Sequence, residues 1–166
     1  MGTRTVIVGI LLAGALLLGA SAMNTSEFDR AMEPILTEYL HIQTALAAGE
    51  TDGVEGAVHA IEGLAKKLDP EMAGGDHAEH YKNIPADILA ACGRLHEAKE
   101  IGSMREGFKD LSKPLSMWVT MAKPKGKSVM YCSMEKAGWV QEGTEVANPY
   151  LGPKMHSCGQ KVGGSD

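Results

Sequence analysis

Apolar residues recur at helical spacing between Ser26 and Met121, with polar residues at the positions between them. Spacings of three and four residues place side chains on one face of an α-helix, whereas a half-buried strand alternates every second residue. The pattern divides into four amphipathic stretches. Their predicted buried faces are Phe28, Met32, Ile35, Tyr39, Ile42 and Leu46; Val54, Val58, Ile61, Leu64 and Leu68; Ile84, Ile88, Cys92, Leu95 and Ile101; and Met104, Phe108, Leu111, Leu115, Trp118 and Met121.

The residues between these stretches predict where the helices begin and end. Gly49 is expected in the left-handed conformation that ends a helix, and Ser103 with Glu106 fits a capping box that starts the last one. Residues 70–83 lack periodicity and are expected to be a longer connection. Short connections favour antiparallel neighbours, so the sequence predicts an all-α, up-down-up-down four-helix bundle over residues 23–124.

From residue 125 onward the helical pattern stops. Glycines and prolines separate short β-favouring stretches at residues 128–132 and 139–141. Trp139 and the run Asn148-Pro149-Tyr150 are typical of packing and turn residues. Residues 125–166 are therefore predicted to form a small irregular, β-containing lobe packed on the bundle, giving one domain overall.

The N-terminus has the pattern of a secretory signal peptide. Arg4 precedes an apolar run from Val6 to Leu18, and Ala20-Ser21-Ala22 offers a cleavage site, so residues 1–22 are predicted to be removed. The apolar run is shorter than the ~20 residues of a spanning helix, so no stable membrane anchor is expected after cleavage; a permanent anchor is the alternative. Export would bring the protein into an oxidising compartment, where disulfides persist.

Charge and motif content limit the classes of function. The formal net charge is −5, and loss of Arg4 with the leader would make it more negative. The chain has no basic cluster of the kind that binds phosphate backbones, so no nucleic-acid partner is expected. It also lacks a phosphate loop and the G-x-S-x-G, H-E-x-x-H and Cys-x-x-Cys motifs. We therefore expect a protein that is not an enzyme.

Soft ligands are concentrated in the predicted lobe. Thiolate and thioether sulfur favours Cu(I) and similar soft ions, and imidazole also binds copper. The candidate metal ligands are Met130, Cys132, Met134, Met155, His156 and Cys158. Two alternatives stay open: Cys132 and Cys158 can form a structural disulfide, worth roughly 3 kcal/mol for a loop of this size, and methionines often only fill gaps in a core.

Two weaker candidates lie in the helical region. Asp76, His77 and His80 could hold Cu(II), Zn or Ni in the Gly-rich connection, although exposed loop histidines are common. Cys92 and His96 are one helical turn apart, yet Cys92 lies on an apolar face and is expected to be a buried, inert thiol.

The lobe also carries a spaced series of residues: Tyr131-Cys132-Ser133-Met134, Gly138-Trp139-Val140, Asn148-Pro149-Tyr150, Gly152, Met155 and Cys158-Gly159. This series resembles the YCPM…W…NPYYG..M..CG signature of a domain of unknown function in bacterial periplasmic proteins. That domain occurs alone or attached to CusB-type adaptor subunits of heavy-metal efflux pumps of the RND class. Arg105, Phe108, Leu111-Ser112 and Leu115 also resemble that family's R..F..LS..L helix. Ser133 replaces a usual proline, Leu151 a usual tyrosine, and His156 adds a possible ligand.

The resemblance implies a periplasmic protein associated with copper or silver export. The leading hypothesis is a soft-metal protein that binds Cu(I) or Ag(I) through the lobe and passes it to, or senses it for, an efflux adaptor or another metal-transfer partner. The alternative is a structural or protein-interaction module whose lobe is closed by a Cys132–Cys158 disulfide and needs no metal.

Overall fold

A computed structural model describes residues 26–72 and 78–165. Residues 1–22, with the predicted signal peptide, lie outside the described residues, as do Asp76 and His77. The helices are α1 (Glu27–Ala48), α2 (Val54–Ala65), the 3₁₀ helix η1 (Pro70–Met72), α3 (Ala78–Tyr81), α4 (Ile84–Glu97) and α5 (Ile101–Ala122). The strands are β1 (Lys127–Cys132), β2 (Ala137–Glu142) and β3 (Gln160–Gly164). No helix in these residues is long and apolar enough to span a membrane.

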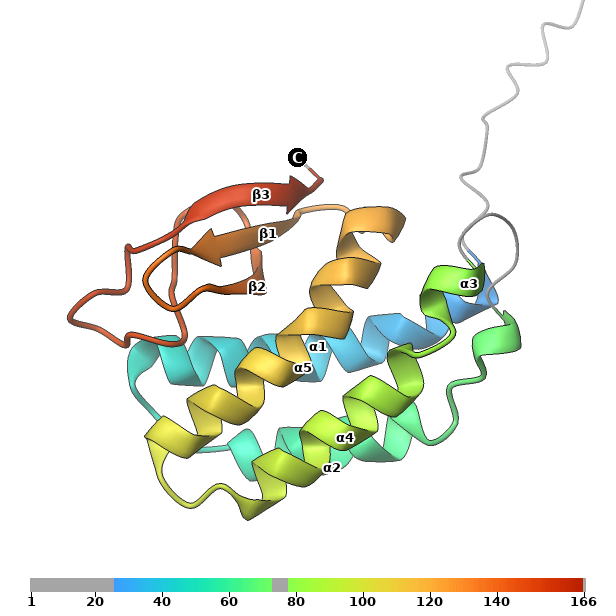
Figure 1. The fold of residues 1–166 in the computed structure, drawn as a ribbon, viewed down its shortest axis with the longest axis horizontal. Helices are drawn as coiled ribbons and strands as arrows, with labels where there is room; N and C mark the ends of the chain where they lie inside the picture. The colour runs from blue at the N-terminus through green and yellow to red at the C-terminus, as the bar shows by residue number, and fades with distance from the viewer. Residues whose placement is uncertain (1–25, 73–77, 166) are drawn as a thin grey trace, which may run out of the picture.

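The described chain is mainly helical, with four long helices and a small sheet that follows them (Figure 1). Successive long helices run in opposite directions; α2 packs on α1 and on α4, and α4 packs on α5. Most of the predicted stripe residues are fully buried, including Phe28, Ile61, Ile88 and Trp118. Gly49 ends α1 with a φ of 80°, as its position predicted.

Two helix boundaries differ from the prediction. The capping box expected at Ser103 and Glu106 is wrong, because α5 already begins at Ile101. Glu100 is extended, its N–H donates to Ser103 Oγ at 3.2 Å, and that hydroxyl donates to the Glu100 carbonyl at 2.8 Å. Ile101 therefore belongs to the fourth long helix and not to the third. Residues 70–83 also contain η1 and α3, which close this end of the core by stacking Tyr81 on Phe28 with ring centroids 4.9 Å apart.

The C-terminal lobe is built on a three-stranded antiparallel sheet in the order β2-β1-β3. The β-favouring stretches of the sequence form β1 and β2, which pair Met130 with Trp139 and Cys132 with Ala137. The third strand was not predicted, because Gln160–Gly164 has little β-propensity of its own and is held by pairing with β1. The sheet packs on α5, and β2 also contacts α1 (Figure 1).

A buried hydroxyl joins the helices to the sheet. Tyr39 of α1 is fully buried, and its Oη lies 2.8 Å from Ser112 Oγ of α5. The same oxygen accepts the backbone N–H of Val140 in β2 at 3.0 Å. Burial raises the pKa of Tyr39 well above its ordinary value of 10, so the phenol stays neutral. One side chain of α1 thus satisfies a polar group of α5 and one of β2 where water is excluded.

Arg105 of α5 makes a second junction. Its Nε donates to the carbonyl of Pro149 at 3.0 Å, and Nη2 donates to the carbonyl of Leu46 near the end of α1 at 3.1 Å. A Cβ on Gly152 would lie 2.6 Å from Arg105 Nη2, and the φ of 69° at Gly152 is in the left-handed region that favours glycine. The lobe is therefore fixed to the helices by specific hydrogen bonds as well as by apolar packing.

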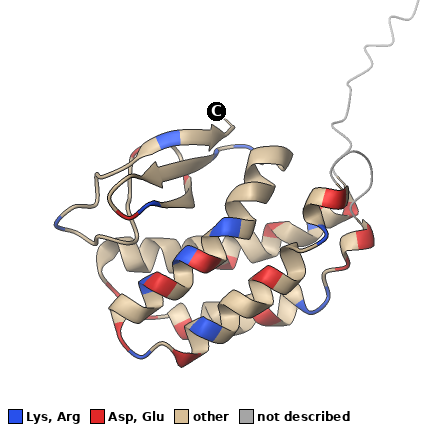
Figure 2. Cartoon of the chain, in the orientation of Figure 1, with Lys and Arg blue, Asp and Glu red and all other residues tan. Residues whose placement is uncertain are grey.

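Acidic and basic side chains are interspersed along the helices (Figure 2). On α5, Lys109 contacts Glu106 and Lys113 contacts Asp110, each at 2.8 Å. Asp110 also pairs with Arg94 of α4 at 2.7 Å. Exposed pairs of this kind, within and between the helices, contribute at most about 1 kcal/mol each to stability. Lys109 also contacts Glu135 of the lobe at 2.7 Å, which adds a partly buried ion pair between α5 and the lobe.

Replacing Tyr39 with Phe tests the first junction. The change leaves Ser112 Oγ and the Val140 N–H without their buried partner, so the free energy of unfolding should fall by about 1–3 kcal/mol. Urea unfolding measures it. Tyr131→Phe is the matched control, because Tyr131 is 37% exposed and should tolerate the loss of its hydroxyl. Equal stability of Tyr39→Phe and the wild type would contradict this role.

Candidate functional site

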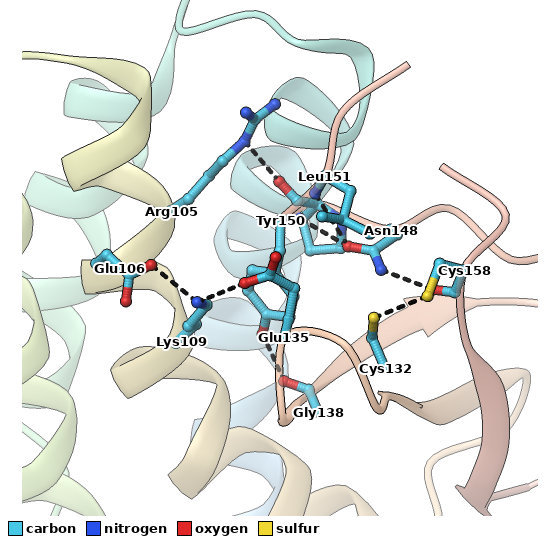
Figure 3. Close-up of polar contacts among 11 residues, drawn as sticks. Arg105, Glu106, Lys109, Cys132, Glu135, Gly138, Asn148, Tyr150, Leu151 and Cys158 are labelled. Atoms are coloured by element: carbon cyan, nitrogen blue, oxygen red, sulfur yellow. Dashed lines mark hydrogen bonds and ion pairs between the residues drawn. The ribbon is translucent and has the colours of Figure 1, made fainter. Parts of the chain in front are cut away.

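Strand pairing brings the two lobe cysteines together. Cys132 ends β1, and the pairing of Tyr131 with Gln160 places the chain just before β3 beside it. Cys158 lies in that stretch, and the two Sγ atoms are 2.9 Å apart as hydrogen-bonded thiols (Figure 3). Cys132 is fully buried and Cys158 is partly exposed. The positions of the two cysteines in the sequence did not show whether they are in contact. The pairing of β1 with β3 brings them together.

The distance of 2.9 Å between the two Sγ atoms is intermediate between the distances expected for a disulfide and for two metal-bound thiolates. A disulfide requires the sulfurs to approach to about 2.05 Å. Two thiolates on one tetrahedral ion, with metal–sulfur bonds near 2.3 Å, are roughly 3.8 Å apart. Each state is therefore about 0.9 Å from the observed separation, and the pair can either close a disulfide or open to hold a soft ion.

Asn148 holds the loop that carries Cys158. Its buried side chain donates from Nδ2 to the Cys158 carbonyl at 2.6 Å. Its Oδ1 accepts the N–H of Tyr150 at 2.8 Å and that of Leu151 at 3.3 Å. The backbone N–H of Asn148 donates to the His156 carbonyl at 2.7 Å. This amide thus ties both ends of the loop together, as Figure 3 shows for its side-chain contacts.

Close packing limits the next residue in the loop to glycine. A Cβ on Gly159 would lie 2.6 Å from Cη2 of Trp139 and 3.2 Å from Val146. Trp139 is fully buried and its Nε1 donates to Gln141 at 2.9 Å, so the indole cannot move aside easily. Cys158 is therefore held at a fixed place in the lobe.

Hydrogen bonds separate the acidities of the two thiols. Burial raises the pKa of Cys132, but hydrogen bonds from Cys158, from the backbone N–H groups of Glu135 and Met134, and from Asn148 bring it below the ordinary value of 9.0. The same contact with Cys132 raises the pKa of Cys158, and burial adds to it. The pair loses its first proton more easily than an isolated thiol, and its second less easily.

Two of the predicted methionine ligands are exposed beside this pair. Met134 is 59% exposed in the turn after β1, and its backbone N–H contacts both sulfurs. Met155 is 44% exposed, and its carbonyl accepts the Cys158 N–H at 3.2 Å. Large apolar side chains are usually buried, so two exposed methionines on the segments that carry the cysteines are candidates for metal ligands. Met130 is different: it is 1% exposed and belongs to the core, away from any ion arriving from solvent.

The His156 side chain lines a groove beside α1. Its Nδ1 lies 3.0 Å from the Pro153 carbonyl, and since a carbonyl only accepts, Nδ1 carries a proton and Nε2 is the nitrogen that a neutral ring would offer to a metal. Gln43, Thr44 and Ala47 of α1 line the same groove. The imidazole has the tautomer that a metal ligand needs, but this structure does not bring it to the sulfur pair.

The weaker candidates from the sequence, His80 and the Cys92–His96 pair, do not join the cysteine pair of the lobe. His80 lies in α3, at the end of the molecule remote from the lobe (Figure 1), and its predicted partners Asp76 and His77 lie outside the described residues. Cys92 is fully buried, as predicted, and burial with the nearby charge of Glu62 raises its pKa to about 11. A protonated, inaccessible thiol is inert, so Cys92 and His96 do not form a site by themselves.

The sequence reasoning missed one group of potential ligands. Ligand atoms of His59, Glu62 and His96 all lie within 4.8 Å of one another. His59 and Glu62 are three residues apart on α2, a spacing that puts both on one helix face, and this was the available signal. The position of His96 opposite them depends on how α4 packs on α2 and could not be read from the sequence.

Residues 35–127 match the family model described as "Protein of unknown function (DUF3347)". The chain belongs to this family. The family match begins within α1 and ends where β1 begins, so it covers the long helices but not the cysteine pair. None of the curated proteins matches the chain, and neither does any solved structure. The DUF3347 match therefore relates the helical part of the chain to a family of unknown function. The chemistry of the cysteine pair must be argued from its own geometry.

The pKa shifts of Cys132 and Cys158 predict how the thiols of the reduced protein titrate. The thiolate absorbance of the reduced protein near 240 nm should rise first below pH 9 and then in a separate step above it, because the Cys132 pKa is lowered and the Cys158 pKa is raised. In Cys158→Ser the two steps should merge into one, apart from the late contribution of Cys92. A single step at the ordinary thiol pKa in the unmutated protein would contradict the hydrogen-bonded pair.

Proposed function

We propose that this protein is a non-enzymatic, periplasmic soft-metal protein that binds Cu(I) or Ag(I) in its reduced C-terminal lobe. The observation that carries the proposal is the Cys132–Cys158 pair, 2.9 Å apart and within the lobe that exposes Met134 and Met155. Sulfur donors of both kinds select soft monovalent ions over Mg²⁺, Ca²⁺ or Mn²⁺. The ion is the cargo of the protein.

The site would load in two stages. Met134 and Met155 are exposed and uncharged, so they can contact an arriving ion without losing a proton. Cys132 then ligates as the thiolate that its hydrogen bonds stabilise, and Cys158 follows as the sulfurs separate. Cys132 has lost its proton to solvent before it binds, and Cys158 releases its proton as its bond to the metal forms. Met130 and His156 are not required in this scheme, because the first is buried in the core and the second faces α1.

The oxidation state of the pair would control loading. Formation of the disulfide removes two electrons and two protons from Cys132 and Cys158, which an external disulfide oxidant must accept. The thiolates are then unavailable to metal. A disulfide reductant reverses the step and restores the ligands.

Localisation and partner follow from the sequence patterns. The signal-peptide pattern in residues 1–22 supports export, and the resemblance to the signature found beside CusB-type adaptors supports an efflux adaptor as the recipient of the ion. We further infer that the four long helices form an up-down-up-down bundle that serves as the rigid support of the lobe. Their alternating directions in Figure 1 support this arrangement.

A second function is favoured by a specific observation. The sulfurs are closer than two ligands of one ion, and Asn148 and Tyr150 of the lobe series donate to the carbonyls of Cys158 and Gly138, which fixes the shape of the lobe without any metal. A protein-interaction module closed by a permanent Cys132–Cys158 disulfide would need only these features. It predicts that metal has no effect on the melting temperature in either redox state.

Replacing both exposed methionines tests the metal proposal. The reduced Met134→Leu/Met155→Leu variant should bind Cu(I) at least about tenfold more weakly in an anaerobic competition titration, because two soft donors are lost while volume is nearly kept. The matched control is Met117→Leu/Met121→Leu, which makes the same change in half-buried residues of α5. Unchanged Cu(I) affinity in the lobe variant, or an equal loss in the control, would contradict the proposal.

A further inference from the structure

A second group of metal-binding side chains lies on the helices. His59 and Glu62 belong to α2 and His96 belongs to α4, and these helices pack against each other. In Figure 1 both lie on the side of the helical layer away from the sheet, so the group is separate from the cysteine pair. It contains no sulfur ligand, because Cys92, one turn before His96, is fully buried and protonated.

The three side chains converge on one point. Nε2 of His96 lies 3.0 Å from Oε2 of Glu62, and the rings of His59 and His96 are 4.4 Å apart between centroids. Two ligands of a tetrahedral ion with bonds near 2.05 Å are roughly 3.3 Å apart, so His96 and Glu62 need to separate by only about 0.3 Å. The proton that Nε2 of His96 donates to Glu62 must be released to solvent as the ion binds. His59 is the farther member; its side chain is 62% exposed, so it can rotate inward without disturbing the core.

The carboxylate is oriented for this role. Lys66, the residue after α2, contacts Oε1 of Glu62 at 2.7 Å and leaves Oε2 to His96. The contacts with Lys66 and His96 hold both carboxylate oxygens of Glu62 in place. Lys66 is 61% exposed, so solvent screens most of its repulsion of a bound cation.

We propose that His59, Glu62 and His96 bind a divalent transition-metal ion of the Zn²⁺ class. Two imidazoles and one carboxylate suit borderline ions, in contrast to the sulfur donors of the lobe. The three residues leave at least one coordination position for water or for a ligand from a partner. Glu55, whose Oε1 is 3.9 Å from Nε2 of His59, lies at the edge of the group and can supply an oxygen as the fourth ligand. This site does not depend on the proposed copper function.

The chain contains its own comparison for this site. His41 and Glu38 of α1 form a similar helical pair, with Nδ1 3.2 Å from Oε2 and His41 66% exposed. No second imidazole joins them among the residues that the structure describes. One histidine and one carboxylate bind Zn²⁺ weakly, so His41 serves as a matched control for a histidine–carboxylate contact without the third ligand.

Zn²⁺ titration of the full chain tests the proposal. The protein carries Cys132→Ser and Cys158→Ser, so that the lobe contributes no thiolate, and isothermal calorimetry measures binding. One equivalent of Zn²⁺ should bind, and His59→Gln and His96→Gln should each weaken that binding at least about tenfold. His41→Gln should leave it unchanged. Glu62→Gln provides a further ligand variant that keeps the size of the side chain, and melting curves without metal show whether each variant folds.

The outcomes separate this site from the lobe. Absence of Zn²⁺ binding, or equal weakening by His41→Gln and by the folded His59→Gln variant, overturns the proposal. Cu(I) affinity of the reduced protein with both lobe cysteines intact should be the same with and without His59→Gln. Absence of Cu(I) binding by the lobe would therefore leave the Zn²⁺ result unaffected. Absence of Zn²⁺ binding by the helical site would likewise leave the Cu(I) titration of the lobe unaffected.

Discussion

The candidate site depends on the buried amide of Asn148. This one side chain accepts two backbone N–H groups, from Tyr150 and Leu151, and donates to the carbonyl of Cys158. Without it, the loop from β2 to β3 would bury several unpaired polar groups, each costing roughly 1–3 kcal/mol. With it, Cys158 lies against Cys132 and the acidities of the two thiols diverge. The position of the sulfurs, and hence any chemistry that they perform, follows from this constraint.

The residues that give the chain its resemblance to a known signature are largely structural. Arg105 joins α5 to the loop and to α1, Ser112 contacts the hydroxyl of Tyr39, and Tyr150 donates to the carbonyl of Gly138. Such residues hold a lobe in a fixed place on a helical support. Few side chains remain as candidate metal ligands, and they form two groups. Soft sulfur ligands lie in the lobe, and harder imidazole and carboxylate ligands lie between α2 and α4.

The helices could be predicted because local spacing determines them. The buried face of α1 was correct, and that of α5 was correct except that Met104 and Met121 are only partly buried. The start of α5 was wrong because Glu100, an unusual capping residue, begins the helix instead of Ser103. Strand β3 was missed because its stability comes from pairing with β1. In the site, residue types indicated which sulfurs to consider, but only tertiary packing shows that Met130 is buried, that His156 faces α1 and that His96 meets Glu62.

The most direct test of the account is a thiol count on the mature protein isolated without reductant, followed by anaerobic Cu(I) titration against a competing chelator before and after reduction. The account predicts that the Cys132–Cys158 pair takes up one Cu(I) when reduced, and that oxidation of the pair abolishes this uptake. A stable disulfide together with no Cu(I) uptake after reduction would contradict it, and would leave the lobe as a structural cap on the helices.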